Sequence, residues 1–401
     1  MYDTQGSISF EDFVAAYKEC RRNKRRKSTA VQFELNWETE VYKLYEEVNA
    51  RTYEIGSSIT FVTTRPKKRE VFAASFRDRV VHHLLCMRLE PLFEEYFIEN
   101  TYNCRKYKGT MYGVQDMHRQ IHKISEGYTK ECWIAKFDLK GFFMSIHKPT
   151  LWLMLQKFIK EKYKGNDIEL VLWLTEKIVM HRPELNCVRK MHNSMWNGLS
   201  KNKSLFTNDD NCGLPIGNLT SQMFANFYLT EFDKYVKSNF KGYGRYVDDF
   251  FIIDTDKRKI MKFIPEMRKM LEPLHIELHD DKIYIQYYTK GCKFIGGVSK
   301  MGRIYVGKRT INNFESKMRE FEKLPITTET AVHFWSSVNS YLGFMIHYSS
   351  YAIRRRILEK WMAKWYSHFY ICSHHSKISL KKRFRIRNEF IHGLILPDIT
   401  I

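Results

Sequence analysis

Two adjacent carboxylates, Asp248 and Asp249, interrupt an apolar stretch of the chain where burial would not place them. Tyr246 and Val247 lead in as strand residues and the apolar run 250–253 follows, so the pattern predicts a hairpin with both aspartates in a two-residue connection. Adjacent aspartates repel each other unless a cation neutralises them, and their oxygen ligands suit a hard divalent metal. For such a dipeptide alone, an ordinary Asp-rich turn is the better interpretation.

A third carboxylate follows a second strand-like segment. The stretch 133–137 is typical of a strand that enters a core, and Asp138 interrupts its apolar pattern at the end. Two-metal nucleotidyl transfer requires carboxylates from separate strand ends, which hold two cations about 3.5–4 Å apart. One cation activates the attacking hydroxyl and the other steadies the leaving pyrophosphate. Asp138 and Asp248 can supply that pair, which favours a metal site over an ordinary turn.

A third segment lies between these two. Gly213 to Gly217 is a glycine-bounded turn where backbone can approach a ligand closely, and apolar residues at helical spacing follow up to Leu229. The plainest interpretation is a loop that enters a buried helix.

In this order the segments resemble the reverse transcriptase family, with Asp-x-x-x-Phe-Phe from Asp138 and Tyr-x-Asp-Asp from Tyr246. Gly-x-x-x-Ser-Gln from Gly217 resembles the bacterial and phage diversity-generating retroelement branch, which is related to group II intron enzymes. Those enzymes make error-prone copies of a template RNA, with mistakes concentrated at adenines. Many family members carry Gln-Gly where this chain has Ile216-Gly217, so a polar contact to the nascent pair is lost and looser base selection is expected. The resemblance is firm over 64–306 and looser outside.

The resemblance implies an α+β fold, a right-hand polymerase whose palm is an antiparallel sheet with helices. The expected division is an N-terminal helical extension (1–60), fingers (61–135), a palm (136–306, with a fingers or insertion segment at 147–212) and a helical thumb (307–401). The polar stretch 181–212 is expected either to contact RNA or an accessory protein, or to be a family-specific surface insertion.

The resemblance also implies two Mg²⁺ ions, with Mn²⁺ as a possible substitute. The expected metal ligands are Asp138, Asp248, Asp249 and the Leu139 carbonyl, and Asp249 is expected mainly to support the turn. Lys282, expected in a turn between two strands, matches a lysine that can protonate the departing pyrophosphate. These residues, Asp138, Asp248, Asp249 and Lys282, form the expected catalytic set.

Contacts to the incoming nucleotide follow from the same resemblance. Arg69 is the match for a basic fingers residue that touches the triphosphate, with Arg77 and Lys68 as second choices, although surface arginines on a hairpin are a serious alternative. Phe143 matches an aromatic ring that packs under the sugar and excludes a 2′-hydroxyl; the sequence leaves open whether Phe142 or Phe143 faces the sugar. The expected substrate-binding set is Arg69, Arg77, Leu139, Phe143, Ile216, Gly217 and Gln222.

Primer and template contacts are expected in three places. The basic loop 101–110 suits a template backbone, the stretch 291–306 resembles a primer-gripping hairpin whose glycines let backbone lie close to the primer, and the predicted thumb carries basic residues. The expected set is Arg105, Lys106, Phe294, Gly296, Gly297, Arg354 and Arg355.

Composition agrees with a polyanionic partner. The 401 residues carry a net charge of +21 and an isoelectric point near 9.4. No apolar stretch approaches the roughly 20 residues of a membrane span, and the N-terminus lacks a signal peptide's basic start and apolar centre. A cytoplasmic protein of a bacterium or phage is therefore expected.

The eight cysteines form no Cys-x-x-Cys pair, which indicates neither a zinc ribbon nor a disulfide scaffold.

The expected function is an RNA-directed DNA polymerase that copies a template RNA into adenine-mutagenised cDNA. Its implied partners are a structured template RNA, the cDNA/RNA duplex, dNTPs and a small basic accessory variability protein that forms a ring. One alternative is another bacterial lineage, namely a retron, an abortive-infection enzyme or a group II intron derivative; Ser221-Gln222 argues against it. The other is an RNA-binding protein with a degenerate polymerase fold, which the intact carboxylates disfavour. No endonuclease, ribonuclease H or integrase motif is expected before Ile401.

Overall fold

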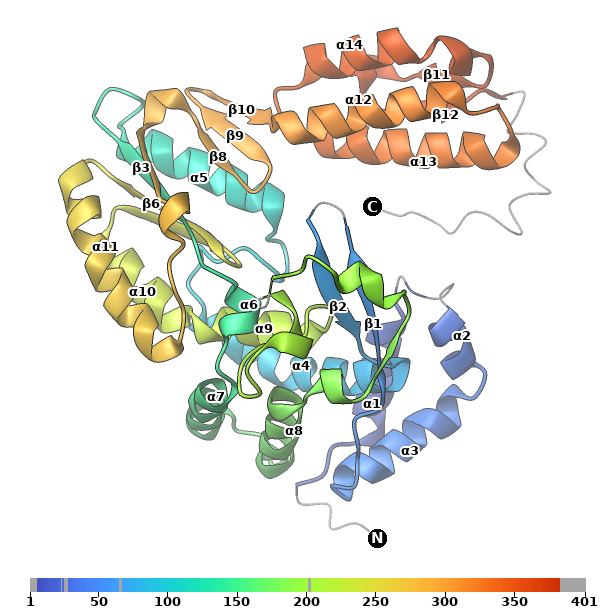
Figure 1. Cartoon of the computed structure of the whole chain (residues 1–401), viewed down its shortest axis with the longest axis vertical. Coiled ribbons are helices and arrows are strands. Elements are labelled where there is room, and N and C mark those ends of the chain that lie inside the picture. The colour runs from blue at the N-terminus through green and yellow to red at the C-terminus, as the bar shows by residue number, and fades with distance from the viewer. Residues whose placement is uncertain (1–5, 23, 25–27, 65–66, 201–202, 383–401) are drawn as a thin grey trace. The chain divides into compact units, whose positions relative to one another are not determined.

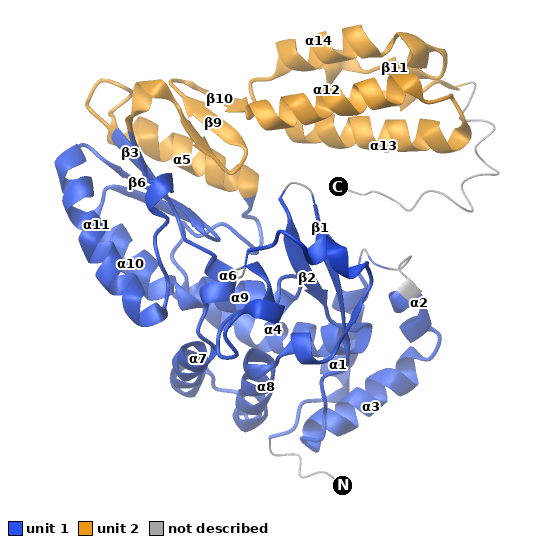
Figure 2. Cartoon of the chain, viewed as in Figure 1, with its two compact units in different colours: residues 1–109, 133–285 blue, residues 110–132, 286–401 orange. Residues whose placement is uncertain are grey.

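Two compact units make up the chain. The computed structural model describes residues 6–22, 24, 28–64, 67–200 and 203–382. The first unit comprises residues 1–109 and 133–285, and the second comprises 110–132 and 286–401 (Figure 2). Each unit has its own apolar core. The segment 110–132, predicted as fingers, packs with the second unit, whereas the division into fingers, palm and thumb stays a prediction.

Helices begin the first unit, as the apolar periodicity predicts. They are α1 (Phe10–Arg21), α2 (Ser28–Glu34) and α3 (Trp37–Asn49), and they lie beside the long α4 (Phe76–Tyr96) (Figure 1). The rings of Tyr17 and Trp37 stack with centroids 5.1 Å apart, which joins α1 to α3. In the basic stretch 21–27, Arg21 pairs with Glu34, and residues 23 and 25–27 lie outside the described part of the chain.

The central sheet of the first unit carries the predicted carboxylates. Its strand order is β5-β6-β3-β7, with bounds Gly242–Tyr246, Asp249–Asp254, Trp133–Asp138 and Tyr284–Tyr287. β3 and β6 are antiparallel, and their register pairs Asp138 with Asp249. Phe250 to Ile253 on β6 are fully buried, so the apolar run fixes the strand in the core. The two strand ends therefore bring the acidic residues to one edge of the sheet.

More helices extend the core of the first unit. They are α6 (Phe142–Ser145), α7 (Lys148–Lys162), α8 (Ile168–Met180), α9 (Leu219–Tyr228), α10 (Thr230–Asn239) and α11 (Lys257–Leu271). Of these, α10 and α11 pack against this sheet. Lys282 was predicted to lie in a turn between two strands, but it ends a short 3-10 helix, Asp280–Lys282. In place of the strand expected before this turn, the structure has a single bridge between Leu139 and Leu278.

A second sheet of the first unit has the order β2-β1-β4. β1 (Ser58–Thr63) and β2 (Arg69–Ala73) form a hairpin, and β4 (Cys187–Arg189) lies parallel to β1. The polar stretch 181–212 is thereby attached to the predicted fingers. The buried carboxylate of Glu70 on β2 also binds this stretch. It accepts hydrogen bonds at 2.7 Å from each of three donors, namely Trp196 Nε1, Ser204 Oγ and Leu205 N.

The second unit combines a small sheet with a helical bundle. Its elements are α5 (Thr110–Ile124), β8 (Cys292–Phe294), β9 (Gly297–Lys300), β10 (Arg303–Val306), α12 (Lys308–Lys323), α13 (Thr328–Met345), α14 (Tyr351–Trp361), β11 (Phe369–Ile371) and β12 (Ile378–Leu380). Phe334 and Trp365 stack at 4.0 Å in the bundle core. The predicted thumb is therefore helical with an added hairpin, β11–β12; residues 383–401 lie outside the described part of the chain.

Helices and mostly antiparallel sheets together match the predicted α+β class. Among the residues that the structure describes, none of the helices has both the length and the apolar character needed to cross a membrane.

Candidate active site

The turn between β5 and β6 differs by one residue from the prediction. Its two connecting residues are Val247 and Asp248, while Asp249 already belongs to β6 and pairs with Tyr246. Val247 has φ 59°, a left-handed conformation that is unusual for a β-branched side chain. The prediction placed both aspartates in the turn because Asp tolerates that conformation better than Val does.

The predicted catalytic residues come together at this turn. Lys282 Nζ donates to Asp138 Oδ2 at 2.5 Å, and the N–H of Leu139 donates to the carbonyl of Asp248 at 3.1 Å. The end of β3 is thus tied both to the turn and to the 3-10 helix. Asp138, Asp248, Asp249 and Lys282 therefore share one small region, with Leu139 beside them.

Electrostatic strain is concentrated on Asp248. Burial, followed by the negative charges of Asp249 and Asp138, raises the pKa of Asp248 to about 6. Burial also raises the pKa of Asp249, and Lys136 opposes this effect. Burial is the largest cause of both raised pKa values, so a cation bound beside these carboxylates would stabilise their ionised forms.

The donor chemistry fits divalent metal ions. Carboxylate and carbonyl oxygens are the ligands that Mg²⁺ and Mn²⁺ prefer, and a lysine ammonium already stands beside Asp138 as a positive group. In the part of the chain that the structure describes, no three His, Cys, Asp or Glu side chains are gathered as a ready ligand cluster.

Arg69 and Arg77 have different surroundings. Arg69 is exposed at the start of β2, and its charge partly opposes the rise in the pKa of Asp248, so it lies near this carboxylate. Arg77 is instead paired with Glu47 and lies over the ring of Tyr53 at 5.2 Å. The guanidinium of Arg77, one of the two second choices, is thus bound inside the protein, and a contact between Arg77 and the triphosphate stays a prediction.

The two phenylalanines after Asp138 also differ. Phe142 is 2% exposed and belongs to the core, whereas Phe143 is only partly buried. The carbonyl of Phe143 accepts a hydrogen bond from Leu214 N at 2.8 Å, which ties α6 to the glycine-bounded turn. Of the two rings, Phe143 therefore has the more accessible surface, and its contact with a sugar stays a prediction.

The glycine-bounded turn packs against β2. The carbonyl of Ile216 accepts from Phe72 N at 2.9 Å, and its side chain packs on the small cluster of Phe72, Met144 and Leu205. A Cβ on Gly217 would lie 2.8 Å from the carbonyl oxygen of Phe72. The close approach of β2 therefore already requires a glycine here, and the approach of a ligand to Gly217 stays a prediction. The amide oxygen of Gln222 accepts from the Cys104 thiol, so its side chain is also engaged.

Substituting Gly217 with Ala should lower the free energy of unfolding by about 1–3 kcal/mol, because it combines φ +127° with the contact to Phe72. Gly109→Ala is the matched control: its φ is +131° and nothing lies within 4 Å of the added Cβ. Urea unfolding should give a clearly smaller loss for Gly109→Ala, and equal losses would show that the approach of β2 is irrelevant.

Two of the predicted nucleic-acid arginines are bound inside the protein, and their contact with primer or template stays a prediction. Arg105 binds Glu94 with Nη2 at 2.8 Å, and its Nη1 donates to the carbonyl of Ile98 at 2.6 Å. The largely buried Arg354 donates to the carbonyl of His374 at 2.8 Å. Both guanidinium groups therefore hold loops in place.

The neighbouring cations remain available at the surface. Lys106 is exposed, 3.4 Å from Glu90, and Arg355 is exposed, 3.7 Å from Glu359. Exposed ion pairs of this kind are weak, so phosphate can compete for both cations.

The predicted primer-gripping residues belong to the second unit. Phe294 is fully buried, so its ring is a core residue and only its backbone could meet a primer. Gly296 has φ +93° and its carbonyl accepts from Gly307 N at 2.8 Å. A Cβ on Gly297 would lie 2.5 Å from Val114 Cγ1, so the packing of α5 on β9 requires this glycine.

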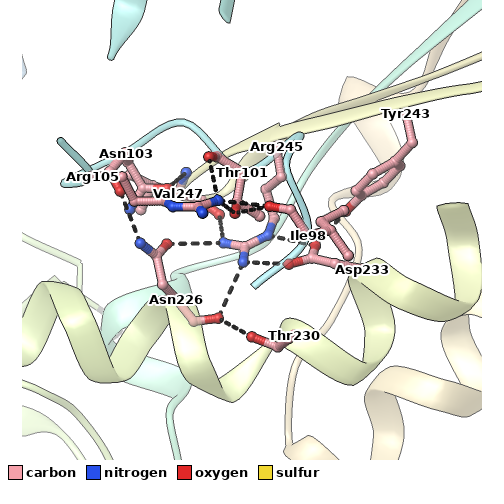
Figure 3. A network of polar contacts seen from close by, with 10 residues as sticks. All are labelled: Ile98, Thr101, Asn103, Arg105, Asn226, Thr230, Asp233, Tyr243, Arg245 and Val247. Atoms are coloured by element: carbon pink, nitrogen blue, oxygen red, sulfur yellow. Dashed lines mark hydrogen bonds and ion pairs between the residues drawn. The ribbon is translucent and has the colours of Figure 1, made fainter. Parts of the chain in front are cut away.

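Sequence reasoning missed a buried polar network next to the turn (Figure 3). Arg245 and Asp233 have fully buried side chains, and Arg245 Nη2 lies 2.6 Å from Asp233 Oδ2. Arg245 Nη1 donates to the carbonyl of Val247 at 3.0 Å, and Asn103 Oδ1 accepts from Val247 N at the same distance. The signal that could have pointed to this network was a charged residue, Arg245, in a strand whose other residues are uncharged.

Comparison with known proteins identifies the class. Residues 64–298 match the family model described as reverse transcriptase (RNA-dependent DNA polymerase), which is more than half of the chain. The chain therefore belongs to the reverse transcriptase family. This membership confirms the predicted family and, with the observed α+β arrangement, the right-hand polymerase fold class.

Relatives of this chain are distant. Protein YkfC of Escherichia coli (strain K12) is 23% identical over 265 residues, 57% of this chain and 62% of that protein. Nuclear intron maturase 1, mitochondrial, of Arabidopsis thaliana is 29% identical over 107 residues, 27% of this chain and 14% of that protein. The chain thus spans less than two thirds of each relative.

Among solved structures, telomerase from Candida albicans in complex with a fragment of telomeric RNA has a TM-score of 0.46 at 12% identity, covering 84% of this chain and 59% of that chain. Apo telomerase from Candida tropicalis has a TM-score of 0.43 at 12% identity, covering 63% and 55%.

Proposed function

We propose that this chain is an RNA-directed DNA polymerase, a nucleotidyltransferase that extends a primer on an RNA template. The observation that carries the proposal is the convergence of Asp138, Asp248 and Asp249 at one edge of the sheet, with the pKa of Asp248 raised to about 6. Membership of the reverse transcriptase family supports the same chemistry.

Asp138 and Asp248, with the Leu139 carbonyl, would hold two Mg²⁺ ions, and Asp249 would support the turn and the local field. When bound, the ions would activate the primer 3′-hydroxyl and neutralise charge on the pyrophosphate. The chain supplies the rest. Lys282 Nζ is the proton donor for the departing pyrophosphate, and Arg69, exposed near the carboxylates, binds the triphosphate.

The proposed substrates are dNTPs, with Phe143 under the sugar, and the proposed nucleic-acid partners are a structured template RNA and the cDNA/RNA duplex. The net charge of +21 supports polyanion binding. Lys106 and Arg355 remain proposed phosphate contacts, and the backbone at Gly296 remains a proposed primer contact.

We further propose that the enzyme acts in a diversity-generating retroelement, with a small basic ring-forming accessory protein as partner. Gly217, Ser221 and Gln222 carry the motif that supports this branch, together with Ile216 in place of an amide. Ile216 is partly buried against the cluster around Phe72, so its side chain is held in place next to the loop that precedes α9.

The test is cDNA synthesis by the purified protein with Mg²⁺ on a defined RNA template, with and without the accessory protein, followed by sequencing. Errors concentrated opposite adenines would support the retroelement role. Faithful products would support the polymerase activity and contradict the role in a diversity-generating retroelement. No products under either condition would favour an RNA-binding protein without activity.

Ile216→Gln should lower the error frequency opposite adenines by about tenfold, because an amide adds a polar contact that discriminates between pairs. Leu153→Gln, at an exposed position on α7, is the control and should leave the error frequency unchanged. An unchanged error spectrum in Ile216→Gln would remove this residue from the explanation of fidelity.

A second candidate is a group II intron-derived reverse transcriptase. The 29% identity to a protein named nuclear intron maturase 1 supports it. Faithful synthesis with a preference for intron RNA over other structured templates would favour this candidate.

A further inference from the structure

We infer that Asn103 and Arg245 are positioning residues that clamp the Val247 backbone and so hold the Asp248 carboxylate where it can bind a metal ion. The inference rests on the proposed polymerase function for its catalytic meaning. It assigns a role to the polar network of Figure 3, which the sequence patterns did not indicate.

The turn needs external support. Val247 has φ 59°, and a left-handed conformation costs a residue with a Cβ about 1–2 kcal/mol. Local backbone strain of this kind persists only where the surroundings impose it. Without such support, the turn would relax and the direction of the next side chain, Asp248, would change.

Two side chains provide the support from opposite sides of the residue. Asn103 Oδ1 accepts from Val247 N at 3.0 Å, and Arg245 Nη1 donates to the Val247 carbonyl at 3.0 Å. Both polar backbone groups of Val247 are therefore bound by side chains. The carbonyl of Asp248 is in turn bound by Leu139 N at 3.1 Å.

The clamping residues are themselves fixed. Asn226 Nδ2, from α9, donates to the carbonyl of Asn103 at 2.9 Å. Arg245 is fully buried and bonded to Asp233 of α10 through Nε at 2.7 Å and Nη2 at 2.6 Å. The hydroxyl of Tyr243 adds a bond to Asp233 at 2.6 Å. Two helices and a loop thus define the position of the turn.

Backbone pairing adds to this rigidity. Tyr102 N donates to the carbonyl of Arg245 at 3.0 Å, and Arg245 N donates to the carbonyl of Asn100 at 2.9 Å. The loop that carries Asn103 therefore runs along the side of β5 that faces away from β6. The backbone hydrogen bonds that hold this loop against β5 therefore also place the Asn103 side chain beside the turn.

The test compares Asn103→Ala with a control in the same network. Asn103→Ala removes the acceptor for Val247 N. Thr230→Val removes the bond from Thr230 Oγ1 to the Asn226 carbonyl, 3.1 Å, which does not touch the turn. Both variants lose one buried hydrogen bond, so similar losses of stability are expected.

Only Asn103→Ala should affect the site. We expect kcat for dNTP incorporation to fall by about tenfold to a hundredfold, with KM for dNTP nearly unchanged. Mn²⁺ affinity, measured by electron paramagnetic resonance without nucleotide or RNA, should weaken by about tenfold. Asn103→Asp keeps an acceptor of the same length and should restore most of the loss, whereas Thr230→Val should match the wild type.

Equal effects of Asn103→Ala and Thr230→Val, or wild-type kcat and Mn²⁺ affinity in Asn103→Ala, would overturn the inference. If Asn103→Ala does not fold, Asn226→Ala replaces it and should give the same pattern in weaker form. If the wild type makes no cDNA but Mn²⁺ affinity still falls only in Asn103→Ala, the polymerase proposal fails and the positioning role stands.

Discussion

Asp248→Asn will abolish cDNA synthesis with Mg²⁺ and will also stabilise the metal-free protein at pH 8. Loss of synthesis follows because a neutral amide replaces the carboxylate that would bind a metal ion. The stability gain follows from the pKa of Asp248, which burial and the charges of Asp249 and Asp138 raise from 3.8 to about 6. RNA binding should be largely unchanged, because it depends on the basic surface.

The sign of the pH effect follows from linkage. Native Asp248 holds its proton more tightly than the unfolded chain does, so its contribution to stability is full below pH 3.8 and is lost as the pH rises through about 6. Above that pH the ionised carboxylate costs the native state about 1–3 kcal/mol. Asn does not ionise, so this cost is removed.

Thermal unfolding in EDTA at pH 8 and pH 4, with primer extension in Mg²⁺, measures both effects. The variant should melt higher than the wild type at pH 8, and the difference should shrink at pH 4. Asp254→Asn, at the other end of β6, is the control. Although burial alone would raise it, the pKa of Asp254 is lowered by hydrogen bonds from Asp256 N and Lys259, so this variant should lose stability at pH 8.

Preserved synthesis in Asp248→Asn would refute the metal role of this residue. An unchanged melting temperature at pH 8 would separately refute the electrostatic strain, whatever the activity.

Arg245→Met should lower the free energy of unfolding by about 3–5 kcal/mol, because it leaves the fully buried carboxylate of Asp233 without its counter-charge. The double variant Arg245→Met/Asp233→Leu should recover much of that stability, since no buried charge remains. It should not recover synthesis, because the Val247 carbonyl still lacks its donor.

Urea unfolding of the single and double variants measures the stability part of this prediction. Lys130→Met breaks an exposed ion pair with Glu126 and serves as the control, with an expected change below about 0.5 kcal/mol. A loss within 1 kcal/mol for Arg245→Met would contradict the role assigned to the buried pair.

The sequence predicted that Asp138 and Asp248 lie at neighbouring strand ends, and the structure places them there. Carboxylates at Asp138 and Asp248 interrupt apolar strands, and such interruptions are visible without a structure. The exact turn was not predictable from propensity, because Val247 adopts a conformation that Val disfavours and that distant contacts with Asn103 and Arg245 impose.

Basic residues were harder to assign than acidic ones. An arginine that binds phosphate and an arginine that binds a protein group look the same in a sequence, as Arg77, Arg105 and Arg354 show. Their partners, among them Glu47 and the His374 carbonyl, come close to them only when the chain folds. The glycines pose the same difficulty. Gly217 and Gly297 are required by β2 and α5, neither of which is near them in the sequence.

The anchoring of Glu70 also constrains the order in which the chain acquires its structure. The groups that donate hydrogen bonds to its buried carboxylate lie 126 to 135 positions further along the chain. In the same way, β1 can pair with β4 only after β4 has been made. During synthesis on a ribosome, the β1–β2 hairpin emerges long before these partners. An unpaired buried carboxylate is costly, so this hairpin reaches its final packing only after residue 205 has been made.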